Sequence, residues 1–274
     1  ADVCRLRVVF LNNQTRNDEA VRVGLEGLRA LGLDLPVDPD ALRASNAAAR
    51  LRVRAILQAR SATLLELEPN TDELSTRRAQ LLTAMISVCY ATNQDLLAAV
   101  IFEMVTILFE HGTFRAAPFA LVMQAQLTAA TGDFVEANEL GDLAIALAKK
   151  LGVRDQEAKI FFCFGCFVAL WKRPLDAVLD VLHKAIEAGV DTGDRVYGSY
   201  SIHCTQITAF ASQAASMDET IAEIDKRTPL VSQLGSLQVL RFIKHAAHAL
   251  AGRTSRLDVL DVRDVRDVRD VPHD

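Results

Sequence analysis

Two cysteines have the spacing that is most often associated with chemistry. Cys163 and Cys166 form a Cys-x-x-Cys motif, the spacing of many redox and zinc sites. The motif lies inside the longest uninterrupted apolar run, Ile160 to Trp171, and no second Cys pair or His pair occurs at ligand spacing. A thiolate is costly in apolar surroundings. We therefore predict that both cysteines are buried and structural.

Histidines offer two further candidates. His245 and His248 would share one helical face, but no Glu or Asp completes the three ligands that a zinc site needs. Alanine follows each of them, whereas a histidine-kinase phosphoacceptor normally has an acidic neighbour. His203 and Cys204 are adjacent, so on a helix they point about 100° apart and do not readily form a nucleophile–base pair. A solvated face for the first pair and coincidence for the second are the simpler interpretations.

Nucleotide-binding motifs are absent from the sequence. It contains neither Gly-x-x-x-x-Gly-Lys-Ser/Thr nor Gly-x-Gly-x-x-Gly, and it lacks the His-Arg-Asp and Asp-Phe-Gly set of protein kinases. One cluster of arginines is either a partner surface or, by default, a solvated helix face. Its members are Arg43, Arg50, Arg52, Arg54 and Arg60. We assign no catalytic, cofactor-binding or metal-binding residue, and we expect this segment not to be an enzyme.

The composition favours an all-α fold, so the cysteines, histidines and arginines discussed above are expected on helices. Half of the 274 residues are apolar, only 6% are aromatic, and glycine (13) and proline (7) are scarce. Capping signals at Asp38, Asp72 and Asn93 and stop signals at Gly32 and Gly112 divide the chain into helices. The expected helices cover about 4–14, 15–31, 38–67, 72–90, 92–111, 115–130, 133–151, 154–172, 174–188, 192–212, 217–234 and 236–250.

Several helices are apolar on two sides. In the helix expected over 133–151, one apolar line contains small residues and a second line contains leucines. The first comprises Phe134, Ala137, Gly141, Ala144, Ala148 and Leu151, and the second Leu140, Leu143 and Leu147. A helix with two apolar sides has neighbours on two sides, and small residues let one neighbour approach closely. The helix over 15–31 repeats this design with Gly24 and Gly27.

A degenerate repeat of about 40 residues is also visible. The stretch from Gly132 to Ala137 matches the tetratricopeptide signature Gly-Asp-Tyr-x-x-Ala, with Ala144 seven residues later. Similar helix starts contain Ala20 and Ala177, and another expected helix starts near Met217. We predict a right-handed solenoid of stacked antiparallel helix pairs over residues 1–252. Residues 253–274 form a low-complexity Asp-Val-Arg tail.

The net charge and the cysteine content limit which partners and which cellular compartment are expected. The 30 basic and 35 acidic residues give a net charge of −5 without a basic stripe, so we expect no nucleic-acid partner. The longest apolar run is shorter than the roughly 20 residues of a membrane span. Five cysteines, an odd number at irregular spacing, are typical of a reducing compartment. Ala1 is followed by no secretion signal, so we expect a cytoplasmic chain that starts within a longer protein.

Several sequence blocks, taken in order, resemble a known family. The blocks are Asp18–Ala20 with 31–36, Phe109–Gly112, Gly132–Phe134, Phe161–Phe167 with Trp171–Leu175, and 188–194 with Tyr197 and Tyr200. They resemble the helical region of multidomain signalling proteins that join a serine/threonine kinase, an AAA-type (STAND-like) ATPase module and a GAF-plus-histidine-kinase unit. The chain differs from this family at Gly198, where alanine is usual, and in its tail.

The resemblance implies a non-catalytic scaffold in signal transduction. Such a segment would contact the neighbouring ATPase and kinase domains of a two-component parent protein, and it would need no cofactor. The first alternative is a free-standing tetratricopeptide-like adaptor that binds a protein or peptide. An all-α enzyme with a polar cavity is a third hypothesis, which the apolar interior positions disfavour.

Overall fold

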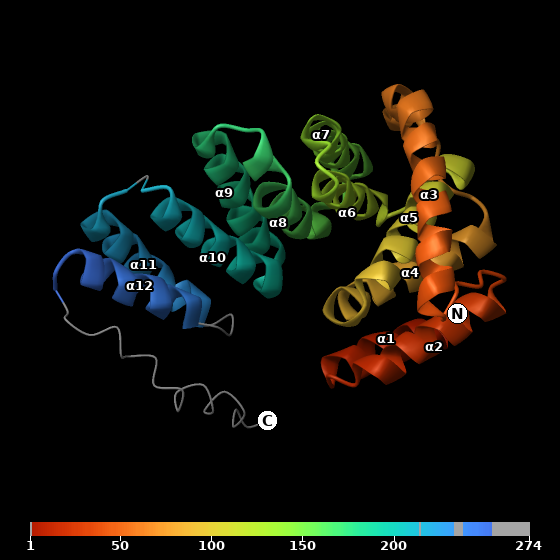
Figure 1. The fold of residues 1–274 in the computed structure, drawn as a ribbon, viewed down its shortest axis with the longest axis horizontal. Helices are drawn as coiled ribbons and strands as arrows, with labels where there is room; N and C mark the ends of the chain where they lie inside the picture. The colour runs from red at the N-terminus through yellow and green to blue at the C-terminus, as the bar shows by residue number, and fades with distance from the viewer. Residues whose placement is uncertain (1, 214, 233–237, 254–274) are drawn as a thin grey trace. The chain divides into compact units, whose positions relative to one another are not determined.

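The computed structural model describes residues 2–213, 215–232 and 238–253, and within them the protein is all-α (Figure 1). These residues form no β-strand, and the isolated β-bridge found among them joins Pro69 and Thr113. The prediction of an all-helical fold is therefore confirmed. The chain divides into two compact units, Ala1–Lys172 and Arg173–Asp274, and each is described by itself.

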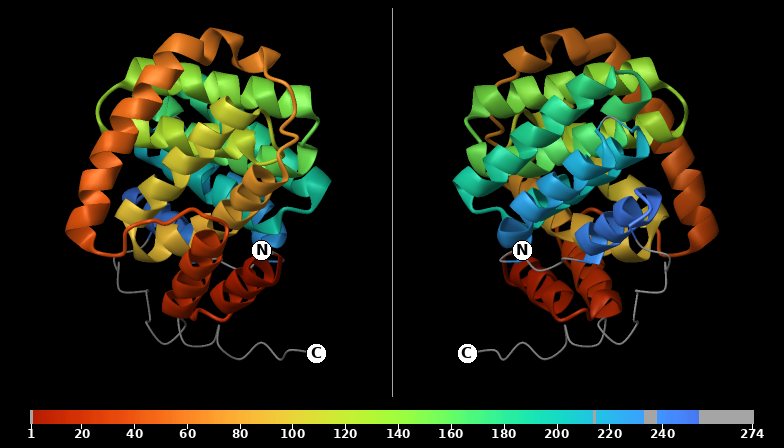
Figure 2. Two further views of the ribbon diagram at one scale, coloured as in Figure 1. Left: turned by 90° about the vertical axis from the view of Figure 1, so that its right-hand side faces the viewer. Right: turned by 90° about the vertical axis from the view of Figure 1, so that its left-hand side faces the viewer.

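The first unit is built from helices of one to six turns. The α-helices are α1 (Asp2–Asn13), α2 (Asn17–Ala30), α3 (Pro39–Arg60), α4 (Glu73–Thr92), α5 (Gln94–His111), α6 (Ala117–Ala130), α7 (Phe134–Leu151) and α8 (Glu157–Phe167). The short 3-10 helices are η1 (Ser61–Glu66), η2 (Arg154–Gln156) and η3 (Ala169–Trp171). Most consecutive helices pack against each other, whereas α3 packs against α5 and α2 against α4. The α6 and α7 helices lie side by side in both views of Figure 2.

The predicted helix starts are confirmed by their caps. The side chains of Asp38, Asp72 and Asn93 each accept a 2.9 Å hydrogen bond from a backbone N–H three residues ahead. Such a bond satisfies one of the N–H groups that the first helical turn leaves without a partner. The side chain at the start of the helix therefore sets the boundary locally.

Gly112 ends α5 in a backbone conformation that other residues rarely adopt. Its φ is +104°, and a Cβ atom placed there would lie 2.4 Å from the carbonyl oxygen of Glu68. The same segment is tied down by a 2.8 Å bond from Thr113 N to Glu68 O and another from Asn70 N to Thr113 O. The connection after η1 and the end of α5 therefore form one rigid edge.

The core of the first unit is centred on α5, which contacts α3, α4 and α6. Almost every residue of α5 from Leu96 to Phe109 is buried, because the helix is apolar around most of its circumference. The largest fully buried side chains of this unit lie on α2, η1, α4, α5, α6 and α8. They are Leu28, Leu64, Leu81, Leu82, Met85, Leu97, Ile101, Phe102, Met104, Leu108, Leu121 and Phe164.

Close helix approach at small residues is confirmed. A Cβ atom on Gly141 would lie 2.3 Å from the ring of Phe164, so α7 and α8 meet directly at this glycine. A Cβ on Gly24 would lie 2.6 Å from the sulfur of Met85, which brings α2 against α4. These glycines lie within helices, and the space that a side chain would take there is occupied by a side chain of the neighbouring helix.

The predicted helices over 38–67 and 154–172 are each wrong in their continuity. The α3 helix ends at Arg60 and continues as η1, and the second stretch is split into η2, α8 and η3. At the second break, the carbonyl of Val168 accepts hydrogen bonds from Asn138 Nδ2 at 3.4 Å and from Trp171 N at 3.2 Å. Tertiary contact thus stabilises a turn that the apolar pattern does not indicate.

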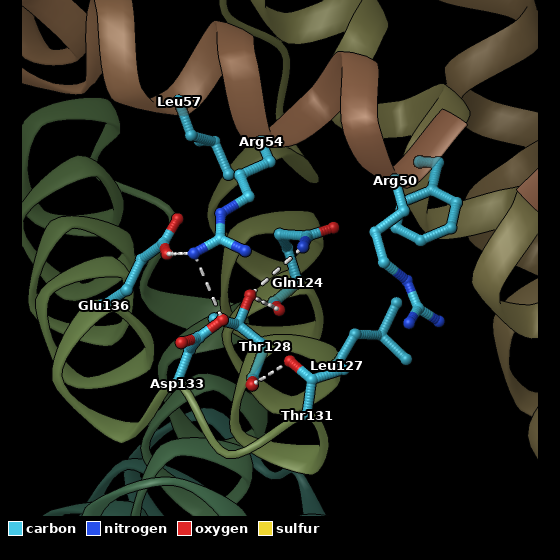
Figure 3. A pocket seen from close by; sticks show the side chains of 10 residues that line it. Arg50, Arg54, Leu57, Gln124, Leu127, Thr128, Thr131, Asp133 and Glu136 are labelled. Carbon is cyan, nitrogen blue, oxygen red and sulfur yellow. Dashed lines mark hydrogen bonds and ion pairs between the residues drawn. The ribbon is translucent and has the colours of Figure 1, made fainter. Parts of the chain in front are cut away.

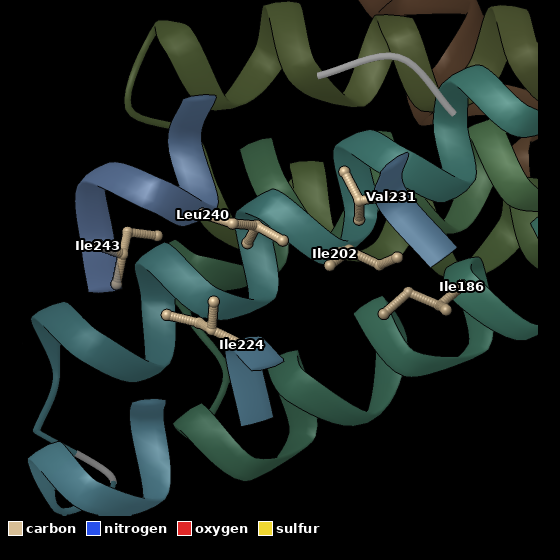
Figure 4. Close-up of a cluster of buried hydrophobic side chains, with 6 residues drawn as sticks. All are labelled: Ile186, Ile202, Ile224, Val231, Leu240 and Ile243. Carbon is tan, nitrogen blue, oxygen red and sulfur yellow. The ribbon is translucent and has the colours of Figure 1, made fainter. Parts of the chain in front are cut away.

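The second unit contains α9 (Leu175–Thr192), α10 (Arg195–Ala211), α11 (Met217–Ser232) and α12 (Gln238–Leu250). Six buried aliphatic side chains from all four helices form its core (Figure 4). They are Ile186, Ile202, Ile224, Val231, Leu240 and Ile243. The predicted residue range 1–252 for one repeat domain therefore spans two compact units.

The α9 helix extends four residues beyond its predicted end at Ala188. Gly193 ends it in the left-handed conformation, with φ +74°, whereas Gly189 remains helical. A Cβ on Gly189 would lie 2.7 Å from the Cα of Gly198 and 3.0 Å from the carbonyl oxygen of Asp194. Gly189 is therefore a packing residue, where the backbone of α10 touches α9.

Two predictions concern the ends and the environment of the chain. The Asp-Val-Arg tail, predicted over 253–274, lies outside the described residues except for Arg253. Among the described helices, none combines the length and the apolar character that crossing a membrane requires.

Candidate functional site

The Cys-x-x-Cys motif lies on α8. Cys163 is buried, and burial raises the pKa of its thiol to about 12. Cys166 is half-buried. Throughout 2–213, 215–232 and 238–253, no three His, Cys, Asp or Glu side chains are placed to share a metal ion. Cys163 therefore has the environment of a packed core cysteine, as predicted. The prediction that Cys166 is also buried is wrong, because three residues further along α8 its side chain is partly open to solvent.

Four of the histidines lie in three different settings. His245 is exposed and His248 half-buried on α12, and between α12 and α11 Lys244 pairs with Asp225. His203 and Cys204 are both buried on α10. His111 lies in the last turn of α5, where its Nδ1 is 3.7 Å from the carboxylate of Asp72.

The arginine cluster on α3 mostly connects helices. Arg52 Nη2 lies 3.3 Å from the carboxylate of Glu103 on α5, and Arg60 donates a 2.6 Å hydrogen bond to the carbonyl of Phe109. The Arg60 guanidinium also lies 5.5 Å from the centre of the Phe109 ring. Arg43 pairs with Asp40 of α3 and with Asp95 of α5. The default interpretation of a solvated face is therefore incomplete, because these side chains attach α3 to α5.

Arg54 extends the same connection to α7. Its Nη2 lies 3.4 Å from Asp133 Oδ2 and 3.8 Å from Glu136 Oε2 (Figure 3). The three side chains are half-exposed, so the strength of the bridge depends on salt. Both carboxylates share one guanidinium, so the bridge links the start of α7 to α3.

Among the carboxylates that pair with the α3 arginines, Glu103 has a pKa shifted by burial. Burial raises the pKa of Glu103 above its ordinary value, while the guanidinium of Arg52 opposes that rise. Glu103 is a charged residue of the most buried helix, and only 23% of its side chain is exposed. The Arg52–Glu103 pair is thus a partly buried titratable contact of the α3–α5 interface.

A small cavity of about 40 Å³ lies beside the Arg54 bridge, between α3, α6 and α7 (Figure 3). The cavity is lined by Arg50, Arg54, Leu57, Phe102, Gln124, Leu127, Thr128, Thr131, Asp133 and Glu136. Gln124 is 5% exposed, and its Oε1 has no hydrogen-bond partner among the described residues. Arg50 makes no ion pair within the described part of the chain. The cavity offers a cation and amide and hydroxyl groups, which suits hydrogen bonding to a small polar group.

Trp171, the last residue of the apolar run, ends η3 and is largely open to solvent. It is 62% exposed and stacks on Phe134, with ring centroids 5.2 Å apart and an interplanar angle of 14°. Its Nε1 donates a 3.1 Å hydrogen bond to the carbonyl of Phe167. One face of the indole therefore covers the start of α7, while the rest of the ring is open to solvent.

Five buried polar side-chain atoms were not anticipated from the sequence. Among the described residues, the buried atoms without a hydrogen-bond partner are Arg5 Nε, Gln124 Oε1, Gln126 Oε1, Gln156 Oε1 and Thr220 Oγ1. Glutamines within the apolar helix α6 are a signal that points to Gln124 and Gln126, because polar residues are rare at such positions. For Gln156 and Arg5 the sequence holds no comparable signal, since their burial depends on contacts with distant segments.

Comparison with known protein families, characterised proteins and solved structures finds no match. The resemblance to multidomain signalling kinases therefore depends on the sequence blocks alone. The geometry of the helices supplies the other basis for a functional proposal.

Proposed function

We propose that the chain is a non-catalytic helical-repeat scaffold within a cytoplasmic multidomain signalling kinase. It would lie between an ATPase module and a sensor histidine kinase and pass the nucleotide state of the first to the second. The observation that supports this most directly is the bridge from Arg54 on α3 to Asp133, just before α7, and to Glu136 on α7. It connects segments about 80 residues apart in the chain, and in the proposal this link and the helix packing around it pass movement from one helix to the other.

We further propose that the helices form a right-handed solenoid of antiparallel pairs. Three neighbouring pairs support this arrangement: α1 with α2, α6 with α7, and α9 with α10. Ala137 at the start of α7 and Ala177 at the start of α9 are separated by 40 residues, which is close to the length of a helix-pair repeat. Repeats of this kind contact mainly their neighbours, so displacement at one end is transmitted by packing.

The apolar outer face of α1 supports contact with another protein module. Val3, Leu6 and Phe10 follow one face at helical spacing and are 69%, 58% and 59% exposed. Contiguous exposed apolar side chains are typical of interaction sites. In the scaffold proposal the module that precedes α1 covers this face.

The reading frame around the gene segment provides the first test. We expect a phosphate-loop ATPase upstream and a histidine kinase downstream. A start codon directly before Ala1 and a stop codon after Asp274 would contradict the scaffold proposal and favour the free-standing adaptor, for which the same α1 face would bind a partner protein.

The second test uses the parent protein. Leu6→Glu and Phe10→Glu should reduce the dependence of autophosphorylation on ATPase state at least fivefold, because the charges oppose burial of the α1 face. Leu51→Glu on α3 is the matched control, since Leu51 is 71% exposed and lies outside this face. Equal effects of all three substitutions would contradict the proposed contact.

A further inference from the structure

A groove in the first unit lies between the end of α3 and the start of α7. Its volume is about 550 Å³, and its lining comes from Leu57, Gln58 and Ser61 on one side and from residues between Gly132 and Leu143 on the other. This volume is comparable with that of small-molecule pockets, about 300–1,000 Å³. The groove therefore has room for several side chains of a bound segment.

Apolar side chains form part of the groove wall. Leu57 is buried, whereas Phe134 and Leu143 are half-buried, and Val135 is 55% exposed. The indole of Trp171 stacks on Phe134 with ring centroids 5.2 Å apart, so an exposed aromatic surface adjoins the groove. Exposed apolar surface that is rimmed by polar residues is typical of interaction sites.

Three carboxylates line the same groove. Asp133, Glu136 and Glu139 come from the start of α7, and among the described residues no lysine or arginine lines the groove. Arg54 pairs with Asp133 and Glu136, whereas Glu139 is exposed and makes no ion pair in the described part of the chain. Three carboxylates against one guanidinium leave the groove negatively charged.

Two cations further along the same elements are engaged elsewhere. Arg60, at the end of α3, donates to the carbonyl of Phe109 at 2.6 Å. Lys150, on α7, donates to the carbonyls of Leu65 and Leu67 at 2.6 and 3.2 Å. Neither forms an ion pair with a carboxylate of the groove, so the negative charge is not cancelled from these positions.

We propose that this groove binds a basic peptide segment of another protein, in which an arginine or lysine stands next to an apolar side chain. The cation would pair with Glu139 and with the two carboxylates that Arg54 contacts, and a guanidinium can also stack on an aromatic ring. The apolar side chain would pack against Val135 and Leu143. The proposal does not rest on a position of the chain within a signalling kinase.

Charge complementarity also ranks the other occupants of the groove. An acidic segment is opposed by repulsion between like charges. The chain's own residues 254–274 contain four arginines but six aspartates, so their net charge has the same sign as that of the groove. A basic segment of a different protein therefore fits the groove better than either.

The test uses the fluorescence of Trp171, which is the single tryptophan of the chain and adjoins the groove. A phage-displayed library of short random peptides without tryptophan is selected on the full chain, and the selected peptides are synthesised and titrated. We expect sequences with arginine or lysine next to apolar residues, a blue shift of the Trp171 emission, and one peptide bound per chain. A tenfold rise in NaCl from about 0.05 M should weaken binding at least tenfold, because salt screens the charges.

Two substitutions locate the binding, and each has a matched control. Glu139→Lys should weaken binding at least tenfold and Val135→Ser at least threefold. Glu110→Lys changes an exposed carboxylate of α5, and Leu51→Ser changes an apolar side chain of α3 that is 71% exposed, and neither residue lines the groove. Both controls should retain affinity within twofold. All four positions are exposed, so circular dichroism should show the same fold in every variant.

Several results would overturn the proposal. They include a library that yields no binder, selected peptides that are mainly acidic, and binding that neither shifts the Trp171 emission nor responds to Glu139→Lys. A rise of tenfold or more in peptide affinity after deletion of residues 254–274 would assign the groove to the chain's own end. A chain that self-associates and is returned to monomers by the peptides would assign it to a second copy.

Discussion

The contact between Gly189 and Gly198 predicts opposite effects for two identical substitutions. A Cβ on Gly189 would lie 2.7 Å from the Cα of Gly198 and 3.1 Å from its N, and these backbone atoms cannot rotate away. A Cβ on Gly198 would lie 3.5 Å from the Cα of Gly189, which is an ordinary contact. The pair is therefore asymmetric, with space for alanine on α10 and none on α9.

The magnitudes follow from two opposing contributions. Alanine is favoured over glycine inside a helix by about 1 kcal/mol, and this applies to both sites. Carbon atoms pack best about 3.5–4.0 Å apart, so Gly189→Ala would push the helices apart by about 1 Å. Overpacking costs about 1–3 kcal/mol, and we expect the upper end because backbone atoms are in contact. Gly189→Ala should then destabilise by about 2 kcal/mol, whereas Gly198→Ala should stabilise by up to about 1 kcal/mol.

Urea unfolding of the full chain, followed by circular dichroism, measures both effects. Hydrogen exchange of peptides from α9 and α10 locates them, and exchange should accelerate there only in Gly189→Ala. For a unit of about 100 residues, a loss of 2 kcal/mol corresponds to a fall of about 10 °C in Tm. Equal stability of the two variants, or destabilisation by Gly198→Ala alone, would refute the assigned packing of α9 against α10.

Three further perturbations test the first unit. Asn93→Ala should destabilise by about 1 kcal/mol in urea, because it removes the acceptor for the first turn of α5, and Asn93→Asp should retain most of the stability. Gly141→Ala should destabilise by about 1–3 kcal/mol, because its Cβ would overlap the buried ring of Phe164, and Phe164→Leu in the same chain should recover part of this loss. For Glu103 the native pKa is raised by burial, so the folded state retains its proton at pH values where the unfolded chain has lost it. Stability should therefore fall as the pH rises from the ordinary value of 4.5 through the higher native pKa. Glu103→Gln should remove this part of the dependence in urea midpoints measured from pH 4 to 7. A wild-type slope that survives in Glu103→Gln would contradict the assignment.

Local signals in the sequence determined the helical class and most helix boundaries. Caps such as Asp38 and Asn93 satisfy backbone groups within one turn, and Gly32 and Gly112 take positive φ where neighbouring residues do not. The two apolar sides of the helix over 133–151 also indicated close packing at Gly141. These features depend on a few adjacent residues, so the sequence alone contains them.

Contacts between distant segments were decided only by the tertiary structure. Arg54 pairs with Asp133, which lies 79 residues later in the chain. From the sequence alone, a charged residue at position 54 is equally compatible with a solvated helix face. Whether Gly189 ends a helix or accommodates another backbone depends on where α10 lies. The unpaired atoms of Arg5 and Gln156 depend likewise on how α1 and η2 approach α4. Side-chain type sets what a residue can do, but long-range packing selects its partner, because many arrangements of equally good helices bury similar apolar area.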